Sequence, residues 1–190
     1  PRFKKVASPY KEFTFAEQLG FYKQVKNLKA DLVHFAMVQQ PILYRGTVIT
    51  TMHDLTTCRF KNPSKNSLVY WFKQRVYVVV NKIVARKSKA IITPTNYVKN
   101  DVADFTGIKP SKITVTYEAA DAIPGAAEPI AELRDKKFLF YLGRPTPHKN
   151  LGMLIDAFEI LRRTHPDLLL VLGGKKDALY DMHEARVKKL

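Results

Sequence analysis

The sequence lacks most features that would cross-link the chain, insert it into a membrane or bind a dinucleotide. Its 190 residues include one cysteine, Cys58, so an internal disulfide is excluded. No secretory signal is present, and no apolar run reaches the roughly 18–20 residues that span a bilayer. Neither the G-x-G-x-x-G fingerprint nor the Walker A spacing occurs. A hydrophobic content of 46% nevertheless predicts a packed, globular protein.

Acidic residues are missing from the whole interval between Asp54 and Asp101, in a chain whose net charge is +15. Apolar residues are interleaved with the cations of this interval, among them Trp71, Phe72 and the run 77–80. This mixture is typical of a solvated basic face, or of a surface that contacts anionic membrane or a lipid-phosphate acceptor. Nucleic acid is a weaker candidate because no helix-turn-helix, RNP-like or zinc-finger pattern accompanies the charge. The basic interval, residues 59–99, contains Arg59, Lys61, Lys65, Lys73, Arg75, Lys82, Arg86, Lys87, Lys89 and Lys99.

Helical and strand patterns alternate along the chain, which predicts an α/β protein with parallel sheets. Thr14 and Glu17 form a capping-box pair that opens the first helix. Thr95 and Gly107 are placed to begin and end a later helix. Strands are predicted at 31–36, 47–52, 90–93, 112–117, 137–142 and 168–172, and helices at 14–30, 67–89, 95–107, 150–164 and from 178 onward.

Composition changes after the fourth predicted strand. Residues 119–132 are rich in Ala, Pro and Gly and poor in large apolar side chains, so they form the best linker candidate. We therefore expect part of one α/β domain at 1–118, a hinge or linker at 119–136, and part of a second α/β domain at 137–190.

Polar residues stand where the predicted strands end, which is where parallel α/β proteins bind their ligands. In the first domain these residues are His34, His53, the stretch Thr93–Asn96 and Glu118. In the second domain, Gly143-Arg144 and Gly173-Gly174-Lys175 follow two strands. We expect a site in a cleft between the domains.

The stretch GRPTPHKN combines several features of an anion-binding loop. Gly143 allows the backbone to approach a ligand, and Arg144 offers a planar fork for bidentate phosphate contact. Lys149 adds a compact positive charge. Asn150 can cap the following helix, whose free N–H groups and dipole favour an anion at the same place. The residues alone equally fit a basic loop ahead of an amphipathic helix.

The order of the motifs resembles that of retaining glycosyltransferases with the GT-B fold, especially family four. Their donor-binding signature resembles YLGRPTPHKNLGMLIDAF. The amino-terminal domain of the family's mannosyltransferase-like branch, where a strand ends in T-x-H-D-L, resembles DLVHFAMVQQPILYRGTVITTMHDLT. The stretch before the hinge resembles IITPTNYVKNDVADFTGIKPSKITVTYEAAD, and a strand and loop of the donor domain resemble VLGGKKD. The resemblance covers most of residues 13–177.

The resemblance implies a role for each residue that matches a family motif. Catalysis is assigned to His53, beside the transferred sugar, and to Arg144 and Lys149, which grip the donor diphosphate. On the residues alone, His148 is positional, Asp54 favours stabilisation of a turn, and a packing role is equally open for His34. The implied diphosphate-binding residues are Gly143, Arg144, Lys149, Asn150, Gly173 and Gly174, and candidates for the acceptor or sugar side are His34, Asp54 and Asn96.

The implied reaction moves a sugar from a nucleoside diphosphate sugar to a saccharide or lipid-linked acceptor with retention of configuration. Branch resemblance suggests GDP-mannose as the donor and cell-envelope polysaccharide as the product. No metal-ligand cluster is visible, so we expect a metal-independent enzyme without a cofactor. We also expect the enzyme to be cytoplasmic and peripheral on the inner membrane face. The alternative is a basic module that binds RNA or anionic lipid without catalysis. An epimerase acting on nucleotide sugars is disfavoured by the missing dinucleotide fingerprint.

Two motifs of the family are not found in the chain. Its glycine-rich amino-terminal loop would lie before Pro1, and the glutamate motif that holds the donor would lie beyond Leu190. We therefore expect an internal piece of a longer protein, with weak activity or none by itself.

Overall fold

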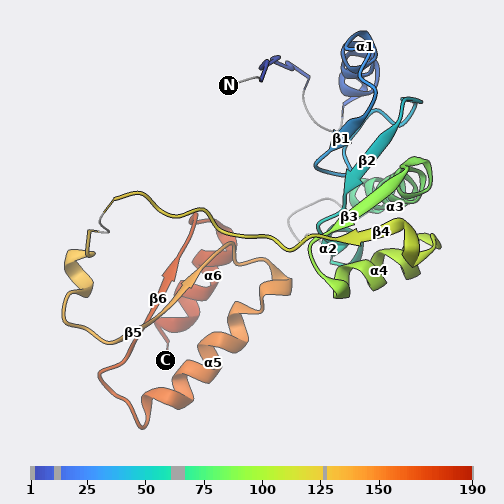
Figure 1. Ribbon diagram of the computed structural model, residues 1–190. Helices are drawn as coiled ribbons and strands as arrows, with labels where there is room; N and C mark the ends of the chain where they lie inside the picture. Colours follow the sequence, from blue (N-terminus) through green and yellow to red (C-terminus); the bar gives the residue numbers. More distant parts are fainter. Residues whose placement is uncertain (1–2, 11–13, 61–66, 126–127, 190) are drawn as a thin grey trace. The chain divides into compact units, whose positions relative to one another are not determined.

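The computed structural model describes residues 3–10, 14–60, 67–125 and 128–189 (Figure 1). The chain forms two compact units, which we call unit 1 (Pro1–Ala120) and unit 2 (Asp121–Leu190). Each unit contains a parallel sheet with helices packed beside it. The α/β class with parallel sheets, predicted from the alternating pattern, is confirmed.

Unit 1 is built on a four-stranded sheet in which the strands follow the order of the sequence. The strands are β1 (Val33–Phe35), β2 (Val48–Thr51), β3 (Ala90–Thr93) and β4 (Ile113–Val115). All three pairings are parallel. The carboxyl ends of the four strands therefore lie along one edge of the sheet, which we call the carboxyl edge.

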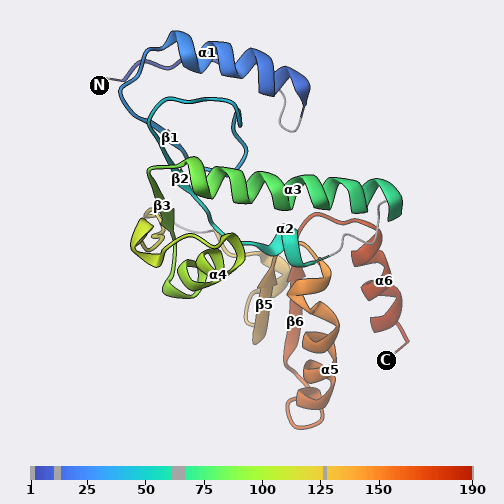
Figure 2. The ribbon, with the colours of Figure 1, turned by 90° about the vertical axis from the view of Figure 1, so that its right-hand side faces the viewer.

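Two helices cover this sheet (Figures 1 and 2). The long helix α3 (Ser67–Lys87) contacts β2 and α4, and α4 (Asn96–Thr106) contacts β3 and β4. The Thr95 hydroxyl accepts a hydrogen bond from Val98 N at 3.1 Å, and Gly107 ends α4 at a φ of 72°, as predicted from the sequence. The core between sheet and helices consists of Val38, Met52, Leu55, Val84, Ala85, Ile91, Val102, Ala103 and Ile113.

The first helix is shorter than predicted. Glu17 N donates to the Thr14 hydroxyl at 3.2 Å, so Thr14 does cap the segment. A π-helical turn, η1 (Glu17–Phe21), then leads into α1 (Tyr22–Asn27). The helix stops before residue 30 because Lys29 adopts a left-handed φ of 49°, which an α-helix cannot continue.

A buried polar ladder joins the long loop after β1 to the sheet and to α3. Gln40 Nε2 donates to the Thr50 hydroxyl at 3.0 Å, and that hydroxyl lies 2.9 Å from Ser88 Oγ. Ser88 in turn donates to Val84 O at 2.7 Å. Gln40, Thr50 and Ser88 are all at most 1% exposed, so water cannot reach these polar groups and they depend on hydrogen bonds within the protein.

Replacing Thr50 tests this ladder. We expect Thr50→Val to lower the free energy of unfolding by about 1–3 kcal/mol, because valine keeps the shape of threonine but removes the acceptor of the buried Gln40 amide. Urea denaturation followed by circular dichroism measures the change. Thr114→Val, on an exposed position of β4, is the matched control, with an expected change within about 0.5 kcal/mol. Equal losses in the two variants would show that the ladder contributes nothing specific.

Unit 2 contains two parallel strands and two longer helices (Figure 1). The strand β5 (Phe138–Leu142) pairs with β6 (Leu169–Gly173), so that Leu142 lies opposite Gly173. The helix α5 (Leu151–Arg162) connects them, and α6 (Ala178–Val187) follows β6. An ion pair between Arg186 and Asp156 joins α6 to α5.

Four short helical turns were not expected from the sequence. They are too short for a hydrophobic period to reveal. They are α2 (Thr56–Arg59), η2 (Pro110–Lys112), η3 (Ala131–Leu133) and η4 (Pro147–Lys149).

Candidate functional site

His53 lies at the carboxyl edge of unit 1, two residues beyond the end of β2. Its Nδ1 is 2.8 Å from Glu118 Oε1, and its Nε2 is 3.0 Å from Ala36 O. Ala36 follows β1 and Glu118 follows β4, so the ring is held between segments from the two outer strands. The His53 and Glu118 side chains remain 51% and 67% exposed, which leaves them accessible to a ligand.

Sequence reasoning placed Glu118 at a strand end but did not pair it with His53. The two residues are 65 positions apart, and their strands are separated by β3. The strand order, which the sequence does not reveal, is what brings them together.

The other predicted residues of unit 1 have partners of their own. His34 Nε2 lies 2.9 Å from the Thr51 hydroxyl, on an exposed position of β1. Asn96 Nδ2 lies 3.4 Å from the Tyr117 hydroxyl. Asp54 Oδ1 accepts a hydrogen bond from Thr56 N at 3.0 Å, which stabilises the turn into α2. The turn role that the residues favoured for Asp54 is therefore present in the structure.

The GRPTPHKN loop of unit 2 begins where β5 ends. Gly143 N donates to Gly173 O at 3.0 Å, which extends the pairing of β5 and β6 by one residue. Arg144 and Lys149 follow, both exposed. Within the described part of the chain, neither side chain forms an ion pair or a hydrogen bond. Among the described residues, two unpaired cations thus lie in the loop that leads from β5 to α5.

The structure corrects the capping role predicted for Asn150. Asn150 occupies the cap position of α5, but its side chain makes no cap hydrogen bond. The preceding turn η4 leaves it at a left-handed φ of 51°, whereas a capping side chain normally needs an extended backbone. Its carbonyl accepts hydrogen bonds from Met153 N at 3.1 Å and Leu154 N at 3.4 Å. The side chain of Asn150 therefore does not satisfy the first N–H groups of α5.

Gly174 allows the ends of β5 and β6 to approach closely. It has a φ of 154°, and a Cβ there would lie 2.3 Å from Gly143 O and 2.8 Å from the Tyr180 hydroxyl. That hydroxyl lies 2.8 Å from both Gly143 O and Gly173 O. The carbonyls of Gly143 and Gly173 are thus engaged within the protein, and the observed role of Gly174 is to bring the two loops together.

A side chain at Gly174 should separate these loops. We expect Gly174→Ala to lower the free energy of unfolding by at least about 2 kcal/mol, because the added Cβ meets backbone atoms as well as an unfavourable φ. Gly107→Ala is the matched control: it has a positive φ but no atom within 4 Å of the added Cβ, so about 1 kcal/mol is expected. Urea denaturation compares them. A smaller loss for Gly174→Ala than for Gly107→Ala would refute the close approach of the two loops.

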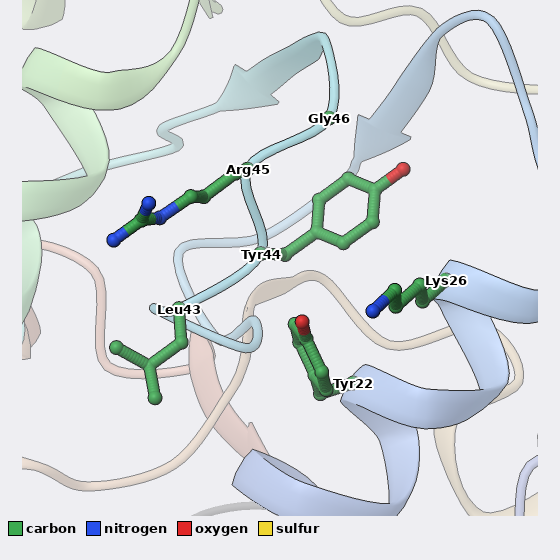
Figure 3. Close-up of a pocket in the computed structure, with 6 residues that line it drawn as sticks. All are labelled: Tyr22, Lys26, Leu43, Tyr44, Arg45 and Gly46. Carbon is green, nitrogen blue, oxygen red and sulfur yellow. The ribbon is translucent and has the colours of Figure 1, made fainter.

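A hollow of about 600 Å³ opens on unit 1, away from the carboxyl edge of its sheet. It is lined by Tyr22, Lys26 and residues Leu43–Gly46. Figure 3 shows Tyr22 and Lys26 projecting from α1 toward Tyr44, whereas the Arg45 side chain points away from them. Because Gly46 precedes β2, this hollow lies near the amino end of that strand. None of the residues predicted for the site lines it.

The described residues contain no group of three or more His, Cys, Asp or Glu that could hold a metal ion. Among those same residues, no helix has the length and apolar character needed to cross a bilayer. Burial raises the pKa of the Cys58 thiol to about 11, so this cysteine is a poor nucleophile.

Comparison with known proteins extends over both units. The protein-family model described as Glycosyltransferase Family 4 matches residues 1–123, and that described as Glycosyl transferases group 1 matches residues 126–190. The uncharacterized glycosyltransferase YqgM of Bacillus subtilis (strain 168) is 30% identical over 102 residues, which cover 54% of this chain and 27% of YqgM.

Among solved structures, the S. aureus MnaA–UDP co-structure is similar with a TM-score of 0.51 and 16% sequence identity. The similarity covers 97% of this chain and 51% of that one. At this identity it concerns the fold alone, and it agrees with the predicted GT-B-like class. The chain spans about a quarter of the length of YqgM and about half of MnaA.

Proposed function

The chain belongs to Glycosyltransferase Family 4, and we propose that it carries parts of the acceptor and donor sides of a retaining, metal-independent enzyme. The reaction moves a sugar from a nucleoside diphosphate sugar to a hydroxyl of a saccharide or lipid-linked acceptor. Unit 1 supplies His53 on the acceptor and sugar side. Unit 2 supplies the diphosphate-binding loop. The connector between the units would serve as the hinge.

The observation that carries this proposal is the pair of free cations beside α5. Arg144 and Lys149 are exposed and make no side-chain hydrogen bond or ion pair within the described residues. Arg144 directly follows the carboxyl end of β5 and its extension at Gly143, and Lys149 lies two residues before a 12-residue helix. At the amino end of such a helix, free N–H groups and the helix dipole favour negative charge. A guanidinium, an ammonium and a helix terminus together suit a ligand with two adjacent phosphates.

This arrangement would assist the departure of the diphosphate. As the bond between sugar and phosphate breaks, the sugar develops oxocarbenium character and negative charge grows on the phosphate oxygens. Arg144, Lys149 and the helix terminus stabilise that growing charge without needing a metal ion. His53 contacts the sugar or supports its transition state. Retention of configuration is proposed from the family resemblance.

The donor proposed from the branch resemblance is GDP-mannose, and the acceptor a saccharide or lipid-linked saccharide of the cell envelope. MnaA forms a co-structure with UDP, which supports a nucleoside diphosphate as the ligand class but leaves the base open. GDP, UDP and ADP should therefore be compared directly.

Removing the two cations tests the donor site. We expect Arg144→Ala combined with Lys149→Ala to weaken binding of the preferred nucleoside diphosphate at least about 100-fold, since each charge-assisted hydrogen bond contributes about 1.5–3 kcal/mol. Isothermal titration calorimetry with GDP, UDP and ADP measures the dissociation constants.

The matched control combines Lys137→Ala with Arg162→Ala. It removes the same charge from unit 2, but at the opposite ends of β5 and α5. Arg162 is separated from the amino end of α5 by about 18 Å, well beyond the screening length of about 8 Å in physiological salt. Equal weakening in both double variants would mean that binding follows net charge and that no diphosphate site exists.

We also propose that α3 is a surface for anionic membrane, which would place the enzyme at the cytoplasmic membrane face. Phe72, Val76, Val79 and Ile83 follow one another at spacings of four, three and four, so they form one stripe along the helix. They are 37–64% exposed, although the opposite face of α3 is packed on the core. Such a helix has a second apolar face that could enter the lipid headgroup region.

Some cations of the basic interval border this stripe and others do not. Lys73, Arg75 and Arg86 are exposed, and Arg75 lies 5.0 Å from the centre of the Trp71 ring. Lys87 instead donates to Pro41 O at 2.8 Å, and burial lowers the pKa of its ammonium to about 8. Lys61 and Lys65 lie outside the described residues.

The stripe can be tested with vesicles of phosphatidylglycerol and phosphatidylcholine. We expect Lys73→Ala, Arg75→Ala and Arg86→Ala together to lower the partition coefficient about 100-fold, because each cation near an anionic surface contributes about 1 kcal/mol. Sedimentation with the vesicles measures the partition coefficient.

The control is a triple variant with the same net charge, Lys137→Ala, Arg162→Ala and Lys189→Ala. It should bind the vesicles like the unsubstituted protein. If instead the α3 variant loses binding to single-stranded RNA and keeps its vesicle binding, the alternative of a basic RNA-binding module is favoured and the membrane surface is rejected.

A further inference from the structure

We infer that Glu118 is the positioning residue of His53: its carboxylate selects ring states that carry a proton on Nδ1 and fixes the orientation of the imidazole. The importance of His53 for glycosyl transfer rests on the proposed function. The contact between the two side chains does not, since it is a feature of unit 1 alone.

The two partners of the ring are both hydrogen-bond acceptors. Ala36 O, 3.0 Å from Nε2, is a carbonyl and can only accept. Glu118 Oε1, 2.8 Å from Nδ1, also only accepts when the carboxylate is ionised. A neutral ring protonated on Nε2 alone would bring its Nδ1 lone pair against the carboxylate. A neutral ring protonated on Nδ1 alone brings its Nε2 lone pair only against the uncharged Ala36 carbonyl, a weaker repulsion than that of an ionised carboxylate. The ring states that the two partners favour therefore carry the Nδ1 proton.

The backbones of both residues are anchored by the sheet. Met52 N, next to His53, donates to Ile92 O at 2.8 Å. Thr116 N, two residues before Glu118, donates to Thr93 O at 2.9 Å. These bonds continue the parallel ladders beyond β2 and β4. His53 thus directly follows a residue of one ladder and Glu118 lies two residues beyond another, so the contact between their side chains orients the ring before any substrate arrives.

The contact should contribute orientation rather than stability. Both side chains are largely exposed, and exposed ion pairs add little to folding free energy because solvent screens them. The carboxylate of Asp54 is engaged with Thr56 N, which leaves Glu118 to fill this role. Loss of Glu118 is therefore expected to change the state of the His53 ring while the protein stays folded.

The test uses the 190-residue chain with ¹⁵N-labelled histidine and a long-range ¹H–¹⁵N correlation spectrum at neutral pH. The His53 signals are assigned by their loss in His53→Asn. In the unsubstituted protein we expect Nδ1 at the position of a protonated ring nitrogen. In Glu118→Ala we expect Nδ1 to move toward the position of an unprotonated nitrogen, while Nε2, which faces the Ala36 carbonyl, carries the proton.

Two further variants make the result decisive. Glu118→Asp keeps the charge but shortens the side chain, so an intermediate Nδ1 shift is expected. Asp104→Asn removes an exposed carboxylate elsewhere in unit 1 and should leave the ring unchanged. The inference is overturned if Nδ1 is unprotonated in the unsubstituted protein, or if Glu118→Ala moves it no more than Asp104→Asn does. The melting temperature of each variant separates this effect from unfolding.

The result is independent of the donor site. Nucleoside diphosphate binding is assigned to unit 2, so Glu118→Ala should change the dissociation constant by less than about threefold. If the unsubstituted protein binds no nucleoside diphosphate, the proposed function is contradicted but the His53–Glu118 contact is unaffected. An unresponsive His53 ring would contradict the contact and leave the donor site standing.

Discussion

The parallel pairing of the strands is the constraint on which the candidate residues of each unit depend. In unit 1, the ladders from β1 to β4 bring four strand ends to one edge. Only there can a residue after β2 meet one segment that follows β1 and another that follows β4. In unit 2, the pairing of β5 with β6 continues to Gly143 and Gly173. It thereby places the Arg144 loop next to the loop after β6.

The candidate residues of the two units have different electrostatic surroundings. In unit 2 the cations are left without partners among the described residues, and the amino end of α5 adds its dipole, so the loop is prepared for an anion. In unit 1 the histidine already has two acceptors, so its ring is oriented before a ligand binds. The proposed roles call for these opposite arrangements, since a diphosphate-binding loop has to attract an anion and a catalytic ring has to keep its orientation.

Much of the fold followed from local patterns in the sequence. The β-branched run before Met52 marks β2, and Thr95 and Gly107 mark the ends of α4, because each of these signals acts within a few residues. Asn150 misled this reasoning: it stands at the start of α5, but the preceding turn gives it a left-handed backbone that withdraws its side chain from capping. Local preference was overridden there by the turn beside it.

The candidate site was predicted less completely than the fold. Strand ends could be located from the sequence, and this led us to name Arg144, Lys149 and His53 as candidates. The pairing of His53 with Glu118 could not be, since it depends on the order of strands in the sheet. Likewise, the charge of the basic interval was evident from the sequence. That the Lys87 side chain is partly buried, and that α3 carries an exposed apolar stripe, could be seen only once the helix was placed on the sheet.

The central claim is that a nucleoside diphosphate binds where β5 leads into α5. Titration of the ¹⁵N-labelled protein with GDP or UDP, followed through its backbone amide signals, tests it most directly. We expect the largest shifts on residues 143–152, including the amino-terminal N–H groups of Leu151 and Gly152. Largest shifts on α3, or around Tyr22 and Tyr44, would contradict it.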